Sequence, residues 1–598
     1  MYSKFQCWRC DKVTSEGKKC GACGMAYYCT DRCRINDEFR HSGSECEDVA
    51  VRYVCHGCKK KKTTQLKMCT NCMKVWFCDR QCQVKAWQSH KEECQAISKA
   101  TIELGSRLNG INTIRMAKPG MSQLYYWGNT PAIDLLNLPM NEGMGYTEPL
   151  SLLLCGVGDP RKVCFTISKL QDAEYKGKVT FVMNDICSCT LARTLLLLYL
   201  LCKGGESKAR SVTQIWYSLY LSEEDHQFVI ACLRDLIQIS NLEVITHGIM
   251  KMNAEQFSSL KNVWITWLHL SRKEFDIFGQ RRQQFDNDRS AAYGMKSYIE
   301  EIPRKHQRSA QEWLQNGMLC SEQNRKNLTK ENFTLMGSSF QLDSNSGSYE
   351  YGVPTDSFPF NGWDYRIVSA MYPKTNSLTV MYNNYITDVL RKCAARLQND
   401  NIHLSFILSN CTDVTPYLPE GMTYDRIMTS NLWDYIHLGD LLKFMKPLLN
   451  ARNKWAVVVT ETQNWIRQLP LLYDKKMGLT VGSAVRQKVL KDTGNKSIAN
   501  SMGKQGFLDY CNITEEVTSF VRASLLDPSP NSSRKTKSHI PSLEKLAAEF
   551  GLRPRDFARR ENTVAPFRWS LNCRRVSLLQ GTEMSVEWSL IPIYPSLD

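Results

Sequence analysis

Residues 150–240 combine short apolar runs with longer stretches of helical length. The runs at 151–155 and 178–183 are typical of buried strands, and helices are predicted after them at 160–170 and 189–202. An apolar strand, a helix and a second apolar strand in this order are typical of a parallel sheet covered by helices. The pattern therefore predicts an α/β fold for this part of the chain.

The pattern continues through the rest of the chain after a helical interruption. Residues 210–340 are predicted to be mainly helical, and 223–239 are amphipathic at helical spacing. Further strands are predicted at 404–408, 424–428 and 456–460, one more helix at 543–550, and terminal strands within 574–591. We expect an α/β body over residues 149–470 with a helical insertion at 205–340. Residues 471–598 either complete that body or form a module of their own.

The longest apolar run, residues 195–202, is eight residues long. A membrane-spanning helix needs about 20 apolar residues, so this run is predicted to belong to a buried helix. The first residues of the sequence contain no apolar core of a signal peptide. We therefore expect a protein that neither spans a membrane nor is secreted, with a cytoplasmic location and the nucleus as the alternative.

Fourteen of the 25 cysteines lie within the first 94 residues, in a pattern that occurs twice. The first copy reads Cys7-x2-Cys10-x9-Cys20-x2-Cys23-x5-Cys29-x3-Cys33-x7-His41-x4-Cys46. The second copy reads Cys55-x2-Cys58-x10-Cys69-x2-Cys72-x5-Cys78-x3-Cys82-x7-His90-x3-Cys94. The same residue types recur in the same order, and only two gaps differ, each by one residue. Cysteines clustered in this way indicate metal binding rather than disulfides.

Each copy offers seven cysteines and one histidine, which is enough for two tetrahedral zinc sites. Both copies resemble MYND zinc fingers, here called finger 1 (residues 1–50) and finger 2 (residues 51–98), with a connector at 99–148. In that family the ligands interleave, which implies four zinc ions, two per finger. The implied ligand sets are Cys7, Cys10, Cys29 and Cys33; Cys20, Cys23, His41 and Cys46; Cys55, Cys58, Cys78 and Cys82; and Cys69, Cys72, His90 and Cys94. Zinc with four protein ligands is structural, and it supplies folding free energy that a unit of about 40 residues lacks.

The MYND resemblance also implies a surface on finger 2 that binds proline-containing peptides. In the family, a glutamine directly after the sixth cysteine and a tryptophan three residues before the histidine form this pocket, and here they are Gln83 and Trp87. One helical turn separates them, so they share a face. The alternative is that Trp87 packs in the small core of its own finger. Finger 1 has Arg34 and Glu38 at these positions, so we expect it to be a structural spacer or to recognise a different surface.

The formal net charge of +16 is smaller once the metal is counted. Four zinc ions bound by fourteen thiolates would add 8 − 14 = −6, which leaves about +10. Over 598 residues this is a mild basic excess. It favours a protein partner over nucleic acid as the main ligand.

A glycine turn between the first predicted strand and its helix indicates a cofactor site. Gly156, Gly158 and Asp159 form this turn, and backbone N–H groups at such a helix start can hold an anion or the polar end of a nucleotide. The second predicted strand leads to Asp185, an acid placed to bind ribose hydroxyls in a Rossmann-like fold. The order of strand, turn, helix, strand and acid predicts cofactor binding by these four residues.

Four stretches of the chain, 127–138, 152–161, 179–193 and 424–435, resemble an uncharacterised domain. That domain accompanies MYND fingers in many fungal and animal proteins. A related domain occurs in an axonemal dynein assembly factor family, which acts in the cytoplasmic preassembly of motor complexes. The architecture is similar to that of S-adenosylmethionine-dependent methyltransferases, which implies a Rossmann-like, methyltransferase-like body with S-adenosylmethionine as a candidate cofactor. Two departures weaken the enzymatic interpretation. Leu154 stands where these enzymes usually place an acid, and Pro160 replaces their third glycine.

The residues after the predicted strand at 424–428 allow two interpretations. Thr429, Ser430 and Asn431 either orient a substrate amine or cap a helix that starts at Leu432, and capping is the commoner role of Ser and Asn.

The sequence favours a non-enzymatic function. The first hypothesis is a zinc-binding interaction or assembly scaffold that captures a proline-containing peptide of a partner through finger 2. The second is an S-adenosylmethionine-dependent methyltransferase that acts on a protein, and a nucleic-acid-bound regulator ranks last.

Overall fold

The computed structural model describes residues 7–10, 12, 17–115, 124–288, 294–295, 298–338, 349–398, 401–469, 487, 491, 507–526 and 539–591. The chain forms two compact units. Unit 1 comprises Met1–Lys118, Asn431–Leu571 and Gln580–Asp598, and unit 2 comprises Pro119–Ser430 and Asn572–Leu579. This division differs from the boundaries expected from the sequence, because residues 431–470 cluster with the fingers and not with the strands that precede them.

Unit 2 is built around five parallel strands. They are β5 (Leu150–Cys155), β6 (Val179–Asp185), β8 (Met250–Met252), β12 (Ile402–Leu408) and β13 (Arg426–Met428), in the spatial order β13-β5-β6-β12-β8. One row across the sheet aligns Arg426, Leu152, Phe181, Leu404 and Met250, all fully buried. Burial on both faces explains why these strands are almost continuously apolar. The predicted α/β class is confirmed, whereas β8 was missed because it is a short edge strand within a region of helical pattern.

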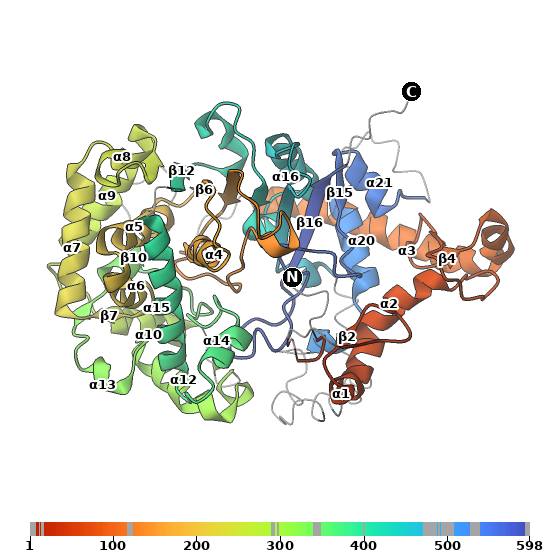
Figure 1. The fold of residues 1–598 in the computed structure, drawn as a ribbon, viewed down its shortest axis with the longest axis horizontal. Coiled ribbons are helices and arrows are strands. Elements are labelled where there is room, and N and C mark those ends of the chain that lie inside the picture. Colours follow the sequence, from red (N-terminus) through yellow and green to blue (C-terminus); the bar gives the residue numbers. More distant parts are fainter. Residues whose placement is uncertain are drawn as a thin grey trace. The chain divides into compact units, whose positions relative to one another are not determined.

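Helices surround these strands. They are α4 (Arg161–Asp172), α5 (Ser188–Gly204), α6 (Ala209–Tyr217), α7 (Glu223–Gln238), α8 (Leu242–Ile245), α9 (Ala254–Leu270), α10 (Ile277–Asn287), α12 (Arg304–Asn316), α13 (Glu322–Arg325), α14 (Tyr365–Met371) and α15 (Leu378–Leu397). The apolar run at 195–202 lies within α5, which packs against α6, α7, α9 and α15 (Figure 1). The predicted buried helix is therefore present. Two short antiparallel pairs complete the unit: β7 (Tyr220–Leu221) with β9 (Lys330–Glu331), and β10 (Met336–Gly337) with β11 (Glu350–Tyr351).

Unit 1 contains the two cysteine-rich segments, called finger 1 and finger 2 above, and its described residues include three strands outside them. Its elements are β1 (Lys18–Lys19), β2 (Tyr27–Tyr28), α1 (Asp31–His41), α2 (Glu47–Ala50), β3 (Lys67–Met68), β4 (Trp76–Phe77), α3 (Arg80–Arg115), α16 (Leu438–Met445), β14 (Val457–Thr462), α20 (Thr514–Ser524), α21 (Leu543–Ala548), β15 (Leu552–Pro554) and β16 (Met584–Leu590). β16 pairs antiparallel with both β14 and β15. α20 packs along α3, which extends well beyond finger 2 into the expected connector (Figure 1).

Two predicted elements differ from the structure in extent. The helix expected from 160 begins at Arg161, with Pro160 before its first turn. Within 574–591 the structure has one strand, β16, where more than one was expected. Asn572–Leu579 belong to unit 2. Among the described residues, no helix has both the length and the apolar character needed to cross a bilayer.

Arg193 on α5 holds several segments of unit 2 together. This residue is 1% exposed, and its guanidinium donates to the carbonyl oxygens of Tyr126, Ile215, Trp216 and Thr334. The group also lies over the ring of Tyr126, 5.0 Å from its centroid. Burial lowers the pKa of Arg193 to about 10, so it remains charged at neutral pH.

We expect Arg193→Met to lower the free energy of unfolding by about 3 kcal/mol, because it leaves buried carbonyl oxygens without their donor. Urea denaturation followed by tryptophan fluorescence would measure this. Arg234→Met, at an exposed position of α7, is the control and should change little. Equal stability of the two variants would contradict the role of Arg193.

Candidate zinc centres and peptide-binding surface

The first two ligand pairs of finger 2, Cys55 with Cys58 and Cys69 with Cys72, each lie on a tight turn. In the first turn the Lys59 amide donates to the Cys55 carbonyl, and in the second the Met73 amide donates to the Cys69 carbonyl. Lys59 and Met73 both have φ of 58°, the left-handed conformation that such turns require. Gly57 cannot be replaced there, since a Cβ atom would lie 2.3 Å from the Cys82 carbonyl oxygen.

The structure brings the sixteen expected ligands together in four clusters, each with its ligand atoms within 4.8 Å of one another. The clusters are Cys7, Cys10, Cys29 and Cys33; Cys20, Cys23, His41 and Cys46; Cys55, Cys58, Cys78 and Cys82; and Cys69, Cys72, His90 and Cys94. These are the interleaved sets that the MYND resemblance implied.

The distances between ligand atoms fit zinc. Zn–S bonds of about 2.3 Å and Zn–N bonds of about 2.0 Å in a tetrahedron give edges of about 3.8 Å between sulfurs and about 3.5 Å between sulfur and nitrogen. In finger 2, Cys58 Sγ and Cys78 Sγ are 3.8 Å apart, and Cys72 Sγ and His90 Nε2 are 3.5 Å apart. The corresponding histidine pair in finger 1, Cys23 Sγ and His41 Nε2, is also 3.5 Å apart. The residues present therefore fit a tetrahedral zinc ion.

Backbone amides around the clusters favour the thiolate form that zinc needs. The amides of Cys58 and Cys78 point at Cys55 Sγ from 3.5 Å and 3.4 Å. Burial would raise the pKa of the Cys55 thiol, but these amides lower it to about 6. Donors of this kind surround metal-bound thiolates in proteins and tune them.

The two residues expected to bind a peptide lie one turn apart on α3. Trp87 is 40% exposed, and its ring meets the expected zinc ligand His90 edge to face with centroids 6.2 Å apart. Gln83 is half-buried. Val84, which the sequence analysis did not single out, is 66% exposed beside them. The core of finger 2 instead takes Ala86 from this helix.

Finger 1 presents different chemistry on the same turn of its helix. Arg34 lies 3.5 Å from Asp31 in an exposed ion pair, and Glu38 is exposed. Ile35, at the position of Val84, is 59% exposed. The two cysteine-rich segments therefore share a ligand pattern but not this surface.

The expected cofactor residues of unit 2 are occupied by contacts within the protein. Gly156 and Gly158 have φ of 64° and 61°, so the turn needs glycine at both positions. The Gly158 amide donates to Asp185, and a second amide, that of Cys187, donates to the same carboxylate. Burial raises the pKa of Asp185, although these amides oppose the shift.

Asp159 likewise makes its contacts within the protein. Its carboxylate accepts from the Gly128 amide at 2.7 Å and forms an ion pair with Arg161. Arg161 in turn covers Gly128 so closely that a Cβ atom there would lie 1.6 Å from the guanidinium. Both acids are thus engaged by the protein itself, and their contacts hold the glycine turn.

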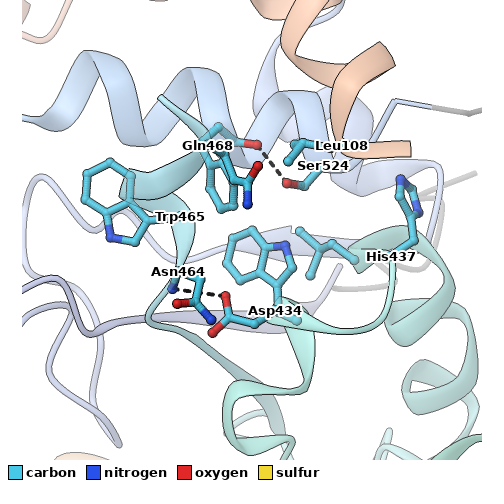
Figure 2. Close-up of a pocket in the computed structure, with 10 residues that line it drawn as sticks. Leu108, Asp434, His437, Asn464, Trp465, Gln468 and Ser524 are labelled. Carbon is cyan, nitrogen blue, oxygen red and sulfur yellow. Dashed lines mark hydrogen bonds between the residues drawn. The ribbon is translucent and has the colours of Figure 1, made fainter. Parts of the chain in front are cut away.

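Unit 1 also contains a small aromatic pocket. It is lined by Leu108, Trp433, Asp434, His437, Leu438, Asn464, Trp465, Gln468, Phe520 and Ser524 (Figure 2). Asp434 accepts from Thr462 Oγ1 at 2.6 Å and from the amides of Gln463 and Asn464 at 2.9 and 3.2 Å. Trp433 and Phe520 stack with centroids 5.2 Å apart. The carboxylate and these rings are engaged in holding the local structure.

The helix expected to start at Leu432 is instead a 3₁₀ turn, Ser430–Asp434. Ser430 has φ of 47°, and Asn431 Nδ2 lies 3.4 Å from Asp434. The capping interpretation was therefore wrong in detail, because Asn431 contacts an acid in the same turn.

Comparison with known proteins identifies two segments. Residues 55–94 match the MYND finger, and residues 126–221 match a domain of unknown function, DUF4470. The chain is 44% identical over 52 residues to the human histone-lysine N-methyltransferase SMYD1, covering 9% of this chain and 10% of that protein. It is 32% identical over 96 residues to the histone-lysine N-methyltransferase ASHR1 of Arabidopsis thaliana, covering 16% and 18%. It is 42% identical over 65 residues to a SET and MYND domain-containing protein of Dictyostelium discoideum, covering 10% and 12%. No solved structure matches.

Residues 55–94 are therefore a MYND finger with Cys/His zinc sites, a module that supports a zinc-binding, protein-interaction role. The chain spans less than a fifth of the length of these curated relatives. Since the similarity is confined to the finger region, their methyltransferase activity does not carry over to this chain.

Removing zinc should unfold finger 2 and leave unit 2 intact, because the finger has too small an apolar core to fold alone. After treatment with a chelator, hydrogen exchange followed by mass spectrometry should show loss of protection in residues 55–98. Protection of β5 and β6 is the internal control. Unchanged exchange in the finger would contradict a structural role for the metal.

Asp185→Asn should lower the free energy of unfolding by about 1–2 kcal/mol, because it weakens the two amide contacts that hold the glycine turn. Asp413→Asn, at an exposed position of unit 2, is the matched control for urea denaturation. A variant as stable as the wild type would contradict this structural role for Asp185.

Proposed function

We propose that this protein is a zinc-dependent interaction or assembly scaffold in which finger 2 captures a proline-containing peptide of a partner protein. Gln83 and Trp87 would bind the peptide. The observation that carries the proposal is the 40% exposure of Trp87 on a helix that also supplies zinc ligands.

The chemistry of this surface suits a short extended peptide. A flat indole ring can receive a proline ring, and a side-chain amide can bond to a peptide backbone whose proline offers no N–H group. Val84 extends the apolar area next to Trp87. The Trp87 ring rests on His90, a member of one of the four ligand clusters. Such a rigid support reduces the entropy lost on binding.

Finger 1 has a different place in this proposal. With Arg34 and Glu38 in place of the glutamine and tryptophan, it would act as a second zinc-stabilised finger that positions finger 2. We propose four zinc ions in all, two in each finger.

The methyltransferase alternative has less support. Asp159 and Asp185, the acids expected to bind S-adenosylmethionine, accept hydrogen bonds from the protein's own amides. A Rossmann-like, methyltransferase-like body that serves as an assembly platform agrees with the parallel strand order of unit 2 and with the expected relation to an assembly factor family. A cytoplasmic location, with the nucleus as the alternative, belongs to the same proposal.

An array of proline-containing peptides, probed with the zinc-loaded full chain, tests the proposal. The tightest binder would then be titrated by calorimetry. Trp87→Ala should weaken binding about 30-fold, the effect of losing an interfacial aromatic side chain worth about 2 kcal/mol.

Glu38→Ala, at the corresponding position of finger 1, is the matched control and should bind as the wild type does. The proposal fails if replacing proline in the peptide has no effect, or if Trp87→Ala binds with unchanged affinity while its zinc content and helicity are those of the wild type.

A further inference from the structure

Two stretches near the end of the sequence contact both fingers within unit 1. They are residues 507–526, which contain α20, and residues 539–560, which contain α21 and β15. We call these two stretches together the C-terminal clamp. Some of its contacts reach the side chains that lie directly behind the zinc ligands.

In finger 2 the contact runs through Asn71. Its side-chain amide donates to Cys94 Sγ at 3.2 Å and lies 3.4 Å from the Cys94 carbonyl oxygen. Its side-chain oxygen accepts the backbone amide of Ile540 at 3.0 Å. Asn71 therefore joins a zinc ligand on one side to the clamp on the other.

Arg522 reinforces this junction. This residue is fully buried, and its guanidinium donates to the carbonyl oxygens of Thr70, Ile540 and Pro541 at 3.3, 3.2 and 2.7 Å. It thus ties α20 to the turn between Cys69 and Cys72. A zinc ion with three thiolates and a neutral histidine carries a net charge of about −1, which a buried guanidinium nearby offsets.

In finger 1 the contact runs through Glu45. Its carboxylate lies 3.2 Å from Nδ1 of His41, the nitrogen that faces away from the zinc cluster. The same carboxylate accepts from Arg40 at 3.0 Å and from Arg560 of the clamp. A carboxylate behind a metal-bound histidine fixes the ring and raises its basicity.

Arg560 is held in place for this contact. Its guanidinium stacks on Trp8 of finger 1, 3.8 Å from the ring centroid. Its backbone has φ of 53°, a left-handed conformation that is strained for a residue with a Cβ atom. In this conformation the guanidinium reaches both Trp8 and Glu45.

Other pairs anchor the clamp further from the metal. Asp48 accepts from Asn512 at 2.9 Å and from Thr514, and Arg52 pairs with Asp556. Arg559 donates to Gln65 at 3.2 Å. These contacts fix the clamp on the fingers without reaching a zinc ligand.

We propose that the C-terminal clamp completes the outer shell of the Cys3His zinc site in each finger, so that retention of these two ions depends on residues more than 400 positions away in the sequence. Asn71 and Glu45 are the positioning residues, acting on Cys94 and His41. The contacts described for the clamp do not involve Gln83, Val84 or Trp87, so the peptide surface and the clamp are separate.

Cadmium-113 NMR of the full chain loaded with cadmium tests this, because each metal site gives its own resonance. Asn71→Ala should shift the resonance of the Cys69, Cys72, His90 and Cys94 site alone. Arg560→Gly should shift that of the Cys20, Cys23, His41 and Cys46 site alone. Glycine relieves the backbone strain at position 560, so this variant should keep its fold.

Arg559→Ala is the matched control, since it removes a clamp contact that reaches no zinc ligand, and it should shift neither resonance. With the zinc-loaded protein, a chromogenic chelator should remove one ion about tenfold faster from Asn71→Ala and from Arg560→Gly than from the control. The proposal is overturned if both variants keep wild-type resonances and wild-type release rates. It is also overturned if Arg559→Ala changes them equally. Peptide binding by finger 2 can fail without affecting either result.

Discussion

Zinc coordination by cysteine and histidine is the constraint on which finger 2 depends. Four of the seven buried core residues of finger 2 are themselves ligands, and Val75, Phe77 and Ala86 are the rest. Among the described residues of finger 1, the buried hydrophobic core is similar, with three ligands among its six members. In finger 2, apolar burial on this scale cannot offset the entropy of ordering the chain, so the metal supplies what the core lacks.

Because the metal stabilises the finger, large apolar side chains can remain on its surface. A finger stabilised by zinc does not need to bury Trp87, and the ring is 40% exposed beside Val84. The same helix carries the ligands Cys82, His90 and Cys94, continues to Arg115 and packs along α20. A rigid, exposed aromatic side chain on such a support is typical of interaction surfaces.

Unit 2 is stabilised differently, by a buried sheet and by polar groups that satisfy one another. Arg193 donates to four carbonyl oxygens, and Asp159 and Asp185 accept backbone amides around the glycine turn. The residues that suggest a cofactor site in the sequence, Asp159 and Asp185, form these internal hydrogen bonds.

The sequence alone determined the local features. The spacing of cysteines and histidines indicated metal binding, and the resemblance to MYND fingers implied how the sixteen ligands are grouped into the four sets that the structure brings together. Apolar runs located β5, β6, β12 and α5, because burial on both faces leaves a continuous apolar pattern. The tertiary structure decided which distant segments meet. It makes Asp185 the acceptor of the Gly158 amide and places residues 431–470 with the fingers. It also brings Asn71 to Ile540 and Glu45 to Arg560. No local pattern encodes these pairs, since each partner is an ordinary polar residue whose use depends on which part of the chain folds against it.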